Sequence, residues 1–352
     1  MNNTLHKLLH QASQLTQSGR LAEATAAIQR LLHGKRPGAA PVPSASPAAA
    51  PDVRDGGVIE VNTAGTAKLS QGEFISGSHS HQQLTRRYKL YVPAGHLGES
   101  LPLVVMLHGC KQNPDDFAAG TGMNQRAQAQ GFFVLYPEQA ADANPSACWN
   151  WFQHQHQQRG AGEPALIASL TLDIIAQYGI DAQRVYVAGL SAGGAMAAVL
   201  AVAYPDIFAA VGVHSGLPAG AASNVAQALM VMKRGRTSAT PATSAISLPT
   251  IVFHGDADST VHPHNGEQLV ASARGQAPGQ PQVEHGLSAQ GQAYTRTIWP
   301  AQPGQAAVEY WQLHGAGHAW SGGRAEGSFT NPQGVDASAE MLRFFWSQRS
   351  GN

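Results

Sequence analysis

A serine flanked by glycines is the residue most clearly placed to do chemistry in this sequence. Residues 189–193 read Gly-Leu-Ser-Ala-Gly, with Ser191 at the centre. The motif follows an apolar run typical of a buried strand and precedes an alanine-rich stretch typical of a helix. The backbone of such a sharp turn is strained, and glycines two residues on either side avoid a clash. The turn presents the hydroxyl at a helix N-terminus, which favours developing negative charge, so Ser191 is the candidate nucleophile.

A nucleophilic serine needs a base and an acidic residue that orients the base. In a strand–turn–helix setting of this kind the chain order is serine, then Asp or Glu, then His. Asp256 and Asp258 both follow the apolar run Thr250–His254, and spacing alone does not choose between them. His318 is the candidate base, because it lies in a glycine-rich loop between the last predicted strand and the final predicted helix. His314, in the same loop, is the alternative.

The negative oxygen formed during acyl transfer must be bound by backbone N–H groups. One is expected from Ala192, the residue after the nucleophile. The second is expected from the loop that follows the apolar run Leu103–Leu107, which begins His-Gly-Cys at residue 108. The N–H of Cys110 is the best candidate for that second donor.

The elements that must position these residues follow an alternating pattern. Short apolar runs typical of buried strands alternate with longer helical patterns, which predicts an α/β fold with a mostly parallel sheet covered by helices on both faces. The long small-residue stretch Gly216–Leu248 is a candidate lid or pocket rim. The expected strands are Arg87–Val92, Leu103–Leu107, Phe132–Tyr136, Arg184–Ala188, Ala209–His214, Thr250–His254 and Val308–Leu313. The expected helices are Asp116–Gln130, Glu163–Gln177, Ala192–Tyr204, His264–Arg274 and Asp336–Ser347.

The N-terminal segment differs in character from the rest of the chain. Apolar residues recur at helical spacing within residues 1–33 and are interrupted around Gly19, which predicts a small helical hairpin. Residues 34–57 are rich in Pro, Ala and Ser and are expected to be a linker to a catalytic domain at 58–352. The hairpin is either a module that docks on the body, a second copy or a partner surface, or an inert extension.

Composition excludes several classes of protein. The chain has 22 basic and 22 acidic residues and 43% hydrophobic residues, a balance that argues against a nucleic-acid binder and against a long disordered chain. No stretch reaches the roughly 18–20 apolar residues of a membrane span, and no standard export signal is present, so we expect a cytoplasmic protein. The pairs His79/His81 and His154/His156 lack a carboxylate or Cys at ligand spacing, so we expect no metal site.

Five motifs, taken together, resemble a known family. They are, in chain order, His108-Gly109-Cys110-x-Gln112, Cys148-Trp149-Asn150-Trp151-Phe152, Gly189-Leu190-Ser191-Ala192-Gly193-Gly194, His254-Gly255-x-x-Asp258-x-x-Val261 and Gly317-His318-x-Trp320-x-Gly322-Gly323. They resemble the polyhydroxybutyrate depolymerase-like esterase family of the α/β-hydrolase superfamily, which also contains feruloyl and acetyl-xylan esterases. The resemblance spans roughly Tyr88 to Phe345.

The resemblance implies roles for particular residues. It favours Asp258 over Asp256 as the acid, with Ser191 as nucleophile, His318 as base and the N–H of Cys110 in the oxyanion hole. It also implies a disulfide between Cys110 and Cys148, which would hold the oxyanion loop beside the tryptophan-rich segment. The residues expected to bind substrate are Trp149, Trp151, Trp320 and His108, and core packing is the alternative, which we expect for at least one of the three tryptophans.

The expected reaction is carboxylic ester hydrolysis through an acyl-enzyme, which needs no metal or organic cofactor. The favoured substrate is poly(3-hydroxybutyrate) or another short-chain polyester or its oligomers. With such a substrate, the N-terminal hairpin and linker are candidates to tether the enzyme to a polyester granule or another surface. A feruloyl or acetyl-xylan ester is the alternative, and a peptide is a weaker one because the three catalytic residues do not distinguish esters from amides. A non-catalytic surface-binding protein on the same fold is the competing hypothesis, and the intact set of Ser191, Asp258 and His318 counts against it.

Overall fold

The computed structural model describes residues 72–96, 98–235, 244–275 and 279–350. The predicted hairpin at 1–33 and linker at 34–57 lie outside these ranges, as does the start of the predicted catalytic domain. None of the helices in the described ranges is long and apolar enough to span a membrane.

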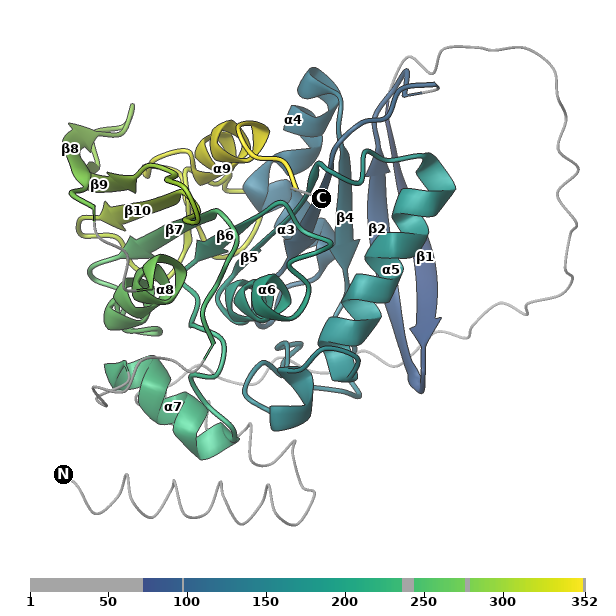
Figure 1. The fold of residues 1–352 in the computed structure, drawn as a ribbon, viewed down its shortest axis with the longest axis horizontal. Coiled ribbons are helices and arrows are strands. Elements are labelled where there is room, and N and C mark those ends of the chain that lie inside the picture. Colours follow the sequence, from purple (N-terminus) through teal and green to yellow (C-terminus); the bar gives the residue numbers. More distant parts are fainter. Residues whose placement is uncertain (1–71, 97, 236–243, 276–278, 351–352) are drawn as a thin grey trace, which may run out of the picture.

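Ten strands of the described chain form one twisted sheet in the order β1-β2-β4-β3-β5-β6-β7-β10-β9-β8 (Figure 1). The six central strands, from β4 to β10, are parallel, and antiparallel strands flank them on both sides. The strands are β1 (Glu73–His81), β2 (Leu84–Val92), β3 (Leu103–Leu107), β4 (Phe133–Pro137), β5 (Val185–Leu190), β6 (Ala210–His214), β7 (Thr250–Gly255), β8 (Gln282–Leu287), β9 (Ala293–Trp299) and β10 (Val308–Leu313). A separate two-stranded sheet pairs β11 (Trp320–Ser321) with β12 (Thr330–Asn331).

Helices cover both faces of the large sheet, as Figure 1 shows. One face carries α5 (Gly162–Tyr178), α6 (Ala192–Ala203) and α8 (His264–Arg274). The other carries α3 (Pro114–Thr121), α4 (Met123–Gln130) and α9 (Ala337–Trp346). A short 3-10 helix, η1 (His154–His156), precedes α5, and α7 (Val225–Arg234) lies on the same side as α6 and α8.

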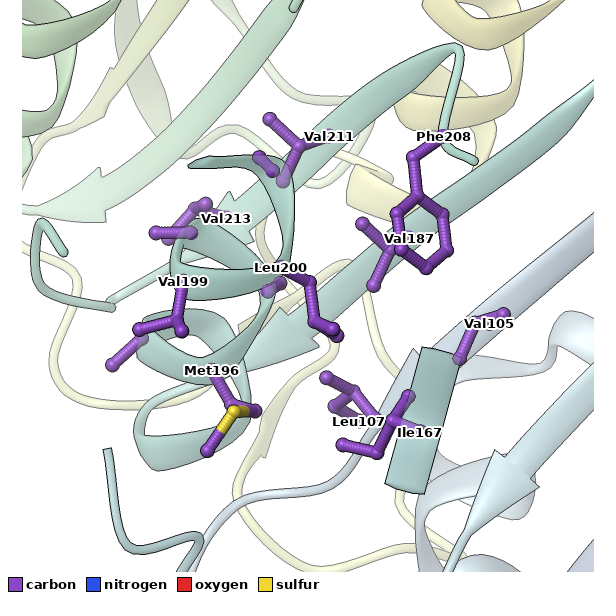
Figure 2. Close-up of a cluster of buried hydrophobic side chains, with 14 of the residues drawn as sticks. Val105, Leu107, Ile167, Val187, Met196, Val199, Leu200, Phe208, Val211 and Val213 are labelled. Atoms are coloured by element: carbon purple, nitrogen blue, oxygen red, sulfur yellow. The ribbon is translucent and has the colours of Figure 1, made fainter. Parts of the chain in front are cut away.

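Two hydrophobic clusters sandwich the sheet, because successive residues of a strand point to opposite faces. In β3, Val105 and Leu107 pack with the α5–α6 side, whereas Val104 and Met106 pack with the α3–α4–α9 side. A strand buried on both faces reads as a continuous apolar run, which is why these strands are recognisable from sequence. Figure 2 shows part of the first cluster, with Met196 and Leu200 of α6, Val187 of β5, and Val211 and Val213 of β6.

The predicted α/β fold with a mostly parallel sheet is confirmed, and the differences are local. The helix predicted at Asp116–Gln130 is two helices, because Gly122 adopts a left-handed conformation (φ 63°) that ends α3 and begins α4. The flanking strands β1, β8 and β9 are not predicted from sequence. Their residues are partly or largely exposed, so their sequences lack a continuous apolar run.

Candidate active site

The turn between β5 and α6 holds Ser191 in a strained backbone conformation with positive φ (φ 57°, ψ −119°). The N–H of Ser191 donates to the carbonyl of His214 at 2.9 Å, which ties the turn to the end of the neighbouring strand β6. A Cβ on Gly189 would come within 2.4 Å of the carbonyl of Gly193, and a Cβ on Gly193 would come within 2.0 Å of the carbonyl oxygen of Leu107. Only glycine fits at either position, which explains the spacing of the motif around the serine.

Asp258 and His318 are hydrogen-bonded to each other at the ends of neighbouring strands. His318 Nδ1 donates to Asp258 Oδ2 at 2.7 Å, and Asp258 Oδ1 accepts the N–H groups of Thr260 and Val261 at 2.8 Å each. Burial by itself raises the pKa of Asp258, but the hydrogen bond and charge of His318 and the N–H of Val261 outweigh it and hold the pKa below its ordinary value. The carboxylate is therefore ionised at neutral pH and fixes the proton of His318 on Nδ1, leaving Nε2 as the atom that can take a proton.

The two alternative candidates from the sequence, Asp256 and His314, are paired with each other. His314 Nδ1 lies 2.8 Å from Asp256 Oδ2, and the N–H of Gly315 donates to Asp256 Oδ1 at 2.7 Å. His314 Nε2 lies 2.8 Å from the hydroxyl of Thr295 on β9. This second pair links the loop that carries Asp258 to the loop that carries His318, and neither of its members borders the cavity described below.

Two buried histidines lie near the ends of the strands that lead into the site, His254 on β7 and His214 on β6. His254 Nε2 donates to the carbonyl of Val261 at 2.9 Å, and Val261 in turn donates its N–H to Asp258. His214 stacks on the ring of Trp320 and accepts the N–H of Ser321 at Nε2. Burial lowers the pKa of His254, and burial lowers the pKa of His214 to about 3, so both rings are neutral. The role of His214 was missed from sequence, where its only signal is its position at the end of a strand.

The loop after β3 is fixed by a closed set of hydrogen bonds. His108 Nδ1 donates to the carbonyl of Gly109 at 2.8 Å, while His108 Nε2 accepts the N–H of Gln139 at 3.1 Å. The side chain of Gln112 accepts the N–H of Gly109 at 2.9 Å, and Trp149 Nε1 donates to the carbonyl of His108 at 3.1 Å. Burial lowers the pKa of His108 to about 4, so the ring stays neutral and keeps this tautomer.

The predicted disulfide between Cys110 and Cys148 is confirmed. It joins the loop after β3 to the segment that precedes Trp149, and a hydrogen bond from the N–H of Lys111 to the carbonyl of Ser146 (2.7 Å) runs beside it. The N–H groups of Cys110 and Ala192 donate no hydrogen bond to any described residue, and both residues border the cavity that borders Ser191. Two unpaired donors at the nucleophile are what an oxyanion hole requires.

A cavity of about 530 Å³ borders both Ser191 and His318. Of the four residues expected to bind substrate, Trp151 borders this cavity, beside Phe152. Trp149, Trp320 and His108 do not: each is at most 1% exposed and packs behind the loops that form the site. The geometry therefore does not support the prediction that these three residues contact substrate, because rings this deeply buried cannot reach a molecule in the cavity. They pack against the loops and hold them in position.

The stretch Gly216–Leu248, predicted to be a lid or rim, contributes to one wall of this cavity in its described part. Helix α7 presents apolar side chains at the helical spacing i, i+3, i+4 and i+7, and Leu217 precedes it. The wall residues of α7 are Val225, Ala228, Leu229 and Met232.

One histidine of each pair that raised the question of a metal is bound to residues of α5 instead. His79 Nδ1 lies 3.2 Å from Asp173, and His79 Nε2 lies 3.0 Å from the hydroxyl of Ser169, both on α5. His156 Nδ1 accepts the N–H of Glu163 at 2.9 Å. In the described part of the chain no group of three His, Cys, Asp or Glu side chains could hold a metal ion.

Comparison with known proteins places the chain among esterases. The family model described as "Esterase PHB depolymerase" matches residues 86–275, just over half of the 352 residues, a range that includes Ser191 and Asp258 and ends before His318. The chain is 32% identical over 225 residues to poly(3-hydroxyalkanoate) depolymerase C of Paucimonas lemoignei, covering 60% of this chain and 53% of that one. It is 33% identical over 195 residues to acetylxylan esterase A of Emericella nidulans, covering 51% of this chain and 63% of that one.

A third curated relative and a solved structure are also similar to the chain. Feruloyl esterase B of Neurospora crassa is 35% identical over 166 residues, covering 46% of this chain and 55% of that one. The matches thus span between about half and two thirds of the length of these curated relatives. Among solved structures, the acetyl xylan esterase of Aspergillus awamori superposes with a TM-score of 0.59 at 22% identity, covering 74% of this chain and 94% of that one.

Proposed function

The chain belongs to the Esterase PHB depolymerase family, and on that premise we propose that it hydrolyses carboxylic esters with Ser191 as the nucleophile. The observation that carries the proposal is the hydrogen bond of 2.7 Å between Asp258 and His318, because His318 borders the same cavity as Ser191. A buried carboxylate that fixes the imidazole proton on Nδ1 prepares Nε2 to act as a base.

The reaction proceeds in two halves. Ser191 Oγ attacks the ester carbonyl and its proton passes to His318 Nε2, while the N–H groups of Cys110 and Ala192 bind the oxygen that becomes negative. The alcohol leaves with that proton and an acyl-enzyme remains. Water then attacks the acyl carbon with His318 again as base, which releases the acid and restores the serine. Asp258 stays ionised throughout and stabilises the imidazolium formed in each half.

We further propose that the substrate is a short-chain polyester, such as poly(3-hydroxybutyrate), or its oligomers. The cavity walls are mainly apolar, with Trp151 and Phe152 on one side and Leu229 and Met232 of α7 among the others, and they suit methyl-bearing acyl units. The similarity to a poly(3-hydroxyalkanoate) depolymerase supports the same substrate class. An acetyl-xylan or feruloyl ester is the second candidate, because relatives with those names are equally similar in sequence.

The substrate proposal is tested by rates on three materials, namely amorphous poly(3-hydroxybutyrate) granules, methyl ferulate and acetylated xylan. We expect the granule suspension to clear. For soluble 3-hydroxybutyrate oligomers, the matching soluble substrate, we expect a kcat/KM at least about tenfold above that for the other two esters, a margin that one well-fitted pocket supplies. Ser191→Ala, with its thermal unfolding checked against the parent, is the control for contaminating esterases. Faster release of ferulate or acetate would assign the enzyme to the second candidate class.

A further inference from the structure

The cavity beside Ser191 has an unusual distribution of charge. Among the described residues, its border contains two lysines, Lys111 and Lys233, and no Asp or Glu. The catalytic carboxylate, Asp258, is buried and engaged by His318 and by backbone N–H groups. From the described part of the chain, a bound molecule therefore meets mainly apolar walls and two positive groups, with no acidic side chain among them.

The described part of the chain gives neither lysine an acidic partner. Lys233 lies in the last turn of α7, and its Nζ donates to the carbonyl of Ser259 at 2.8 Å, one residue after Asp258. Lys111 directly follows Cys110, and its backbone is held in a left-handed conformation (φ 66°). Neither side chain forms an ion pair with any residue in the described ranges, and both are exposed. The carbonyl of Ser259 uses one of the three donors of Lys233 and leaves two for a ligand.

We propose that this cavity selects esters that carry a free carboxylate, with Lys233 as its principal ligand and Lys111 as a second positive group. The inference rests on the proposed function and narrows its substrate: the preferred molecules are short hydroxyacid oligoesters, whose acid end supplies a carboxylate on an otherwise apolar chain. Acetylated or feruloylated neutral sugars offer no such group. A lysine ammonium pairs with a carboxylate as a point charge and needs no fixed bidentate geometry, which suits ligands of several lengths.

The test compares a 3-hydroxybutyrate trimer that has a free carboxylate with the same trimer capped as a primary amide, which removes the charge without adding an ester. We expect kcat/KM to be about three- to tenfold higher for the acid, mainly through a lower KM, as befits a partly exposed charge pair. The preference should shrink when the ionic strength is raised from about 0.05 to about 0.5 M, because salt screens the attraction.

Variants locate the effect. Lys233→Met should abolish the preference for the acid over the amide, and Lys233→Glu should reverse it. Arg234→Met is the matched control, because Arg234 is the next residue of α7, carries the same charge and does not border the cavity; it should keep the preference. Equal rates on acid and amide, or equal losses in Lys233→Met and Arg234→Met, would overturn the inference. Hydrolysis of p-nitrophenyl butyrate, a neutral ester, distinguishes failure of the selectivity from failure of the proposed function. If this ester is not hydrolysed either, the proposed ester hydrolysis is wrong, and not only the selectivity for a carboxylate.

Discussion

At the scale of residues, a continuous series of hydrogen bonds runs through the motif around Asp258. His254 holds the carbonyl of Val261, and Val261 and Thr260 hold Asp258 Oδ1, which leaves Oδ2 for His318. Gly255 is required for a different reason: a Cβ there would lie 2.2 Å from the carbonyl oxygen of Ala316 in the loop that carries His318. His254, Gly255 and Val261 of this motif thus set the position of the acid relative to the base.

The pair Asp256 and Asp258 offers a matched test of which carboxylate serves the reaction. We expect Asp258→Asn to lower kcat by about 10³–10⁴-fold, because an amide cannot fix the reactive tautomer of His318 or stabilise its charge. Asp256→Asn should lower kcat by less than about tenfold, since Asp256 bonds the partly exposed His314 and lies off the cavity. Steady-state rates on p-nitrophenyl butyrate measure both, and similar losses in the two variants would contradict the assignment.

Sequence reasoning identified these candidates but could not place all of them. Spacing alone left Asp256 and Asp258 equivalent, because both follow the same strand, and it was the resemblance to the esterase family that favoured Asp258. Sequence reasoning assigned Trp149 and Trp320 to substrate because large rings cluster in the motifs. Both rings instead fill space behind the loops, and motif position carries no information on which face of a loop a side chain occupies.

At the scale of elements, predictability follows burial. Strand β3 agrees with its predicted range, and β5, β6 and β7 agree to within two residues, because strands buried on both faces are continuous apolar runs. Helix α7 was not predicted as a helix, because the stretch Gly216–Leu248 that contains it was interpreted only as a small-residue insertion and a candidate lid or pocket rim. Its apolar residues nevertheless recur with the period of a helix that has one face on a cavity.

The elbow between β5 and α6 gives a prediction at this scale. We expect Gly193→Ala to lower the free energy of unfolding by at least about 3 kcal/mol, because the added methyl would overlap the carbonyl of Leu107 on a packed strand. Gly317→Ala is the control, because a Cβ there meets no atom within 4 Å. Thermal unfolding should show a clear loss in the first variant only, and an unchanged midpoint for Gly193→Ala would show that the turn is less tightly packed than the structure indicates.

At the scale of the whole molecule, the site is supported by buried neutral histidines, and they couple its stability to pH. Burial lowers the pKa of His108 to about 4 and of His214 to about 3, whereas both are near 6.5 in an unfolded chain. Between pH 6.5 and about 4 the unfolded chain therefore binds protons that the folded chain does not. It follows that stability is lost as the pH falls through this window.

The expected size of this loss is roughly 4 kcal/mol between pH 7 and pH 5 for the two histidines together, with His254 adding to it in the same direction. Urea denaturation followed by fluorescence at the two pH values measures the change. A free energy of unfolding that stays constant from pH 7 to pH 5 would mean that these rings are protonated in the folded protein.

The central claim is that Ser191 is an activated nucleophile in an ester-hydrolysing site, and covalent labelling tests it most directly. The parent protein is treated with a fluorophosphonate probe and the adduct is located by peptide mass spectrometry, with Ser191→Ala and Asp258→Asn treated in parallel. The account predicts a single adduct on Ser191, none in Ser191→Ala, and labelling slowed by about 10³-fold in Asp258→Asn. A parent protein that stays unlabelled, or a probe attached at another serine, would contradict the account and favour a non-catalytic binding protein on the same fold.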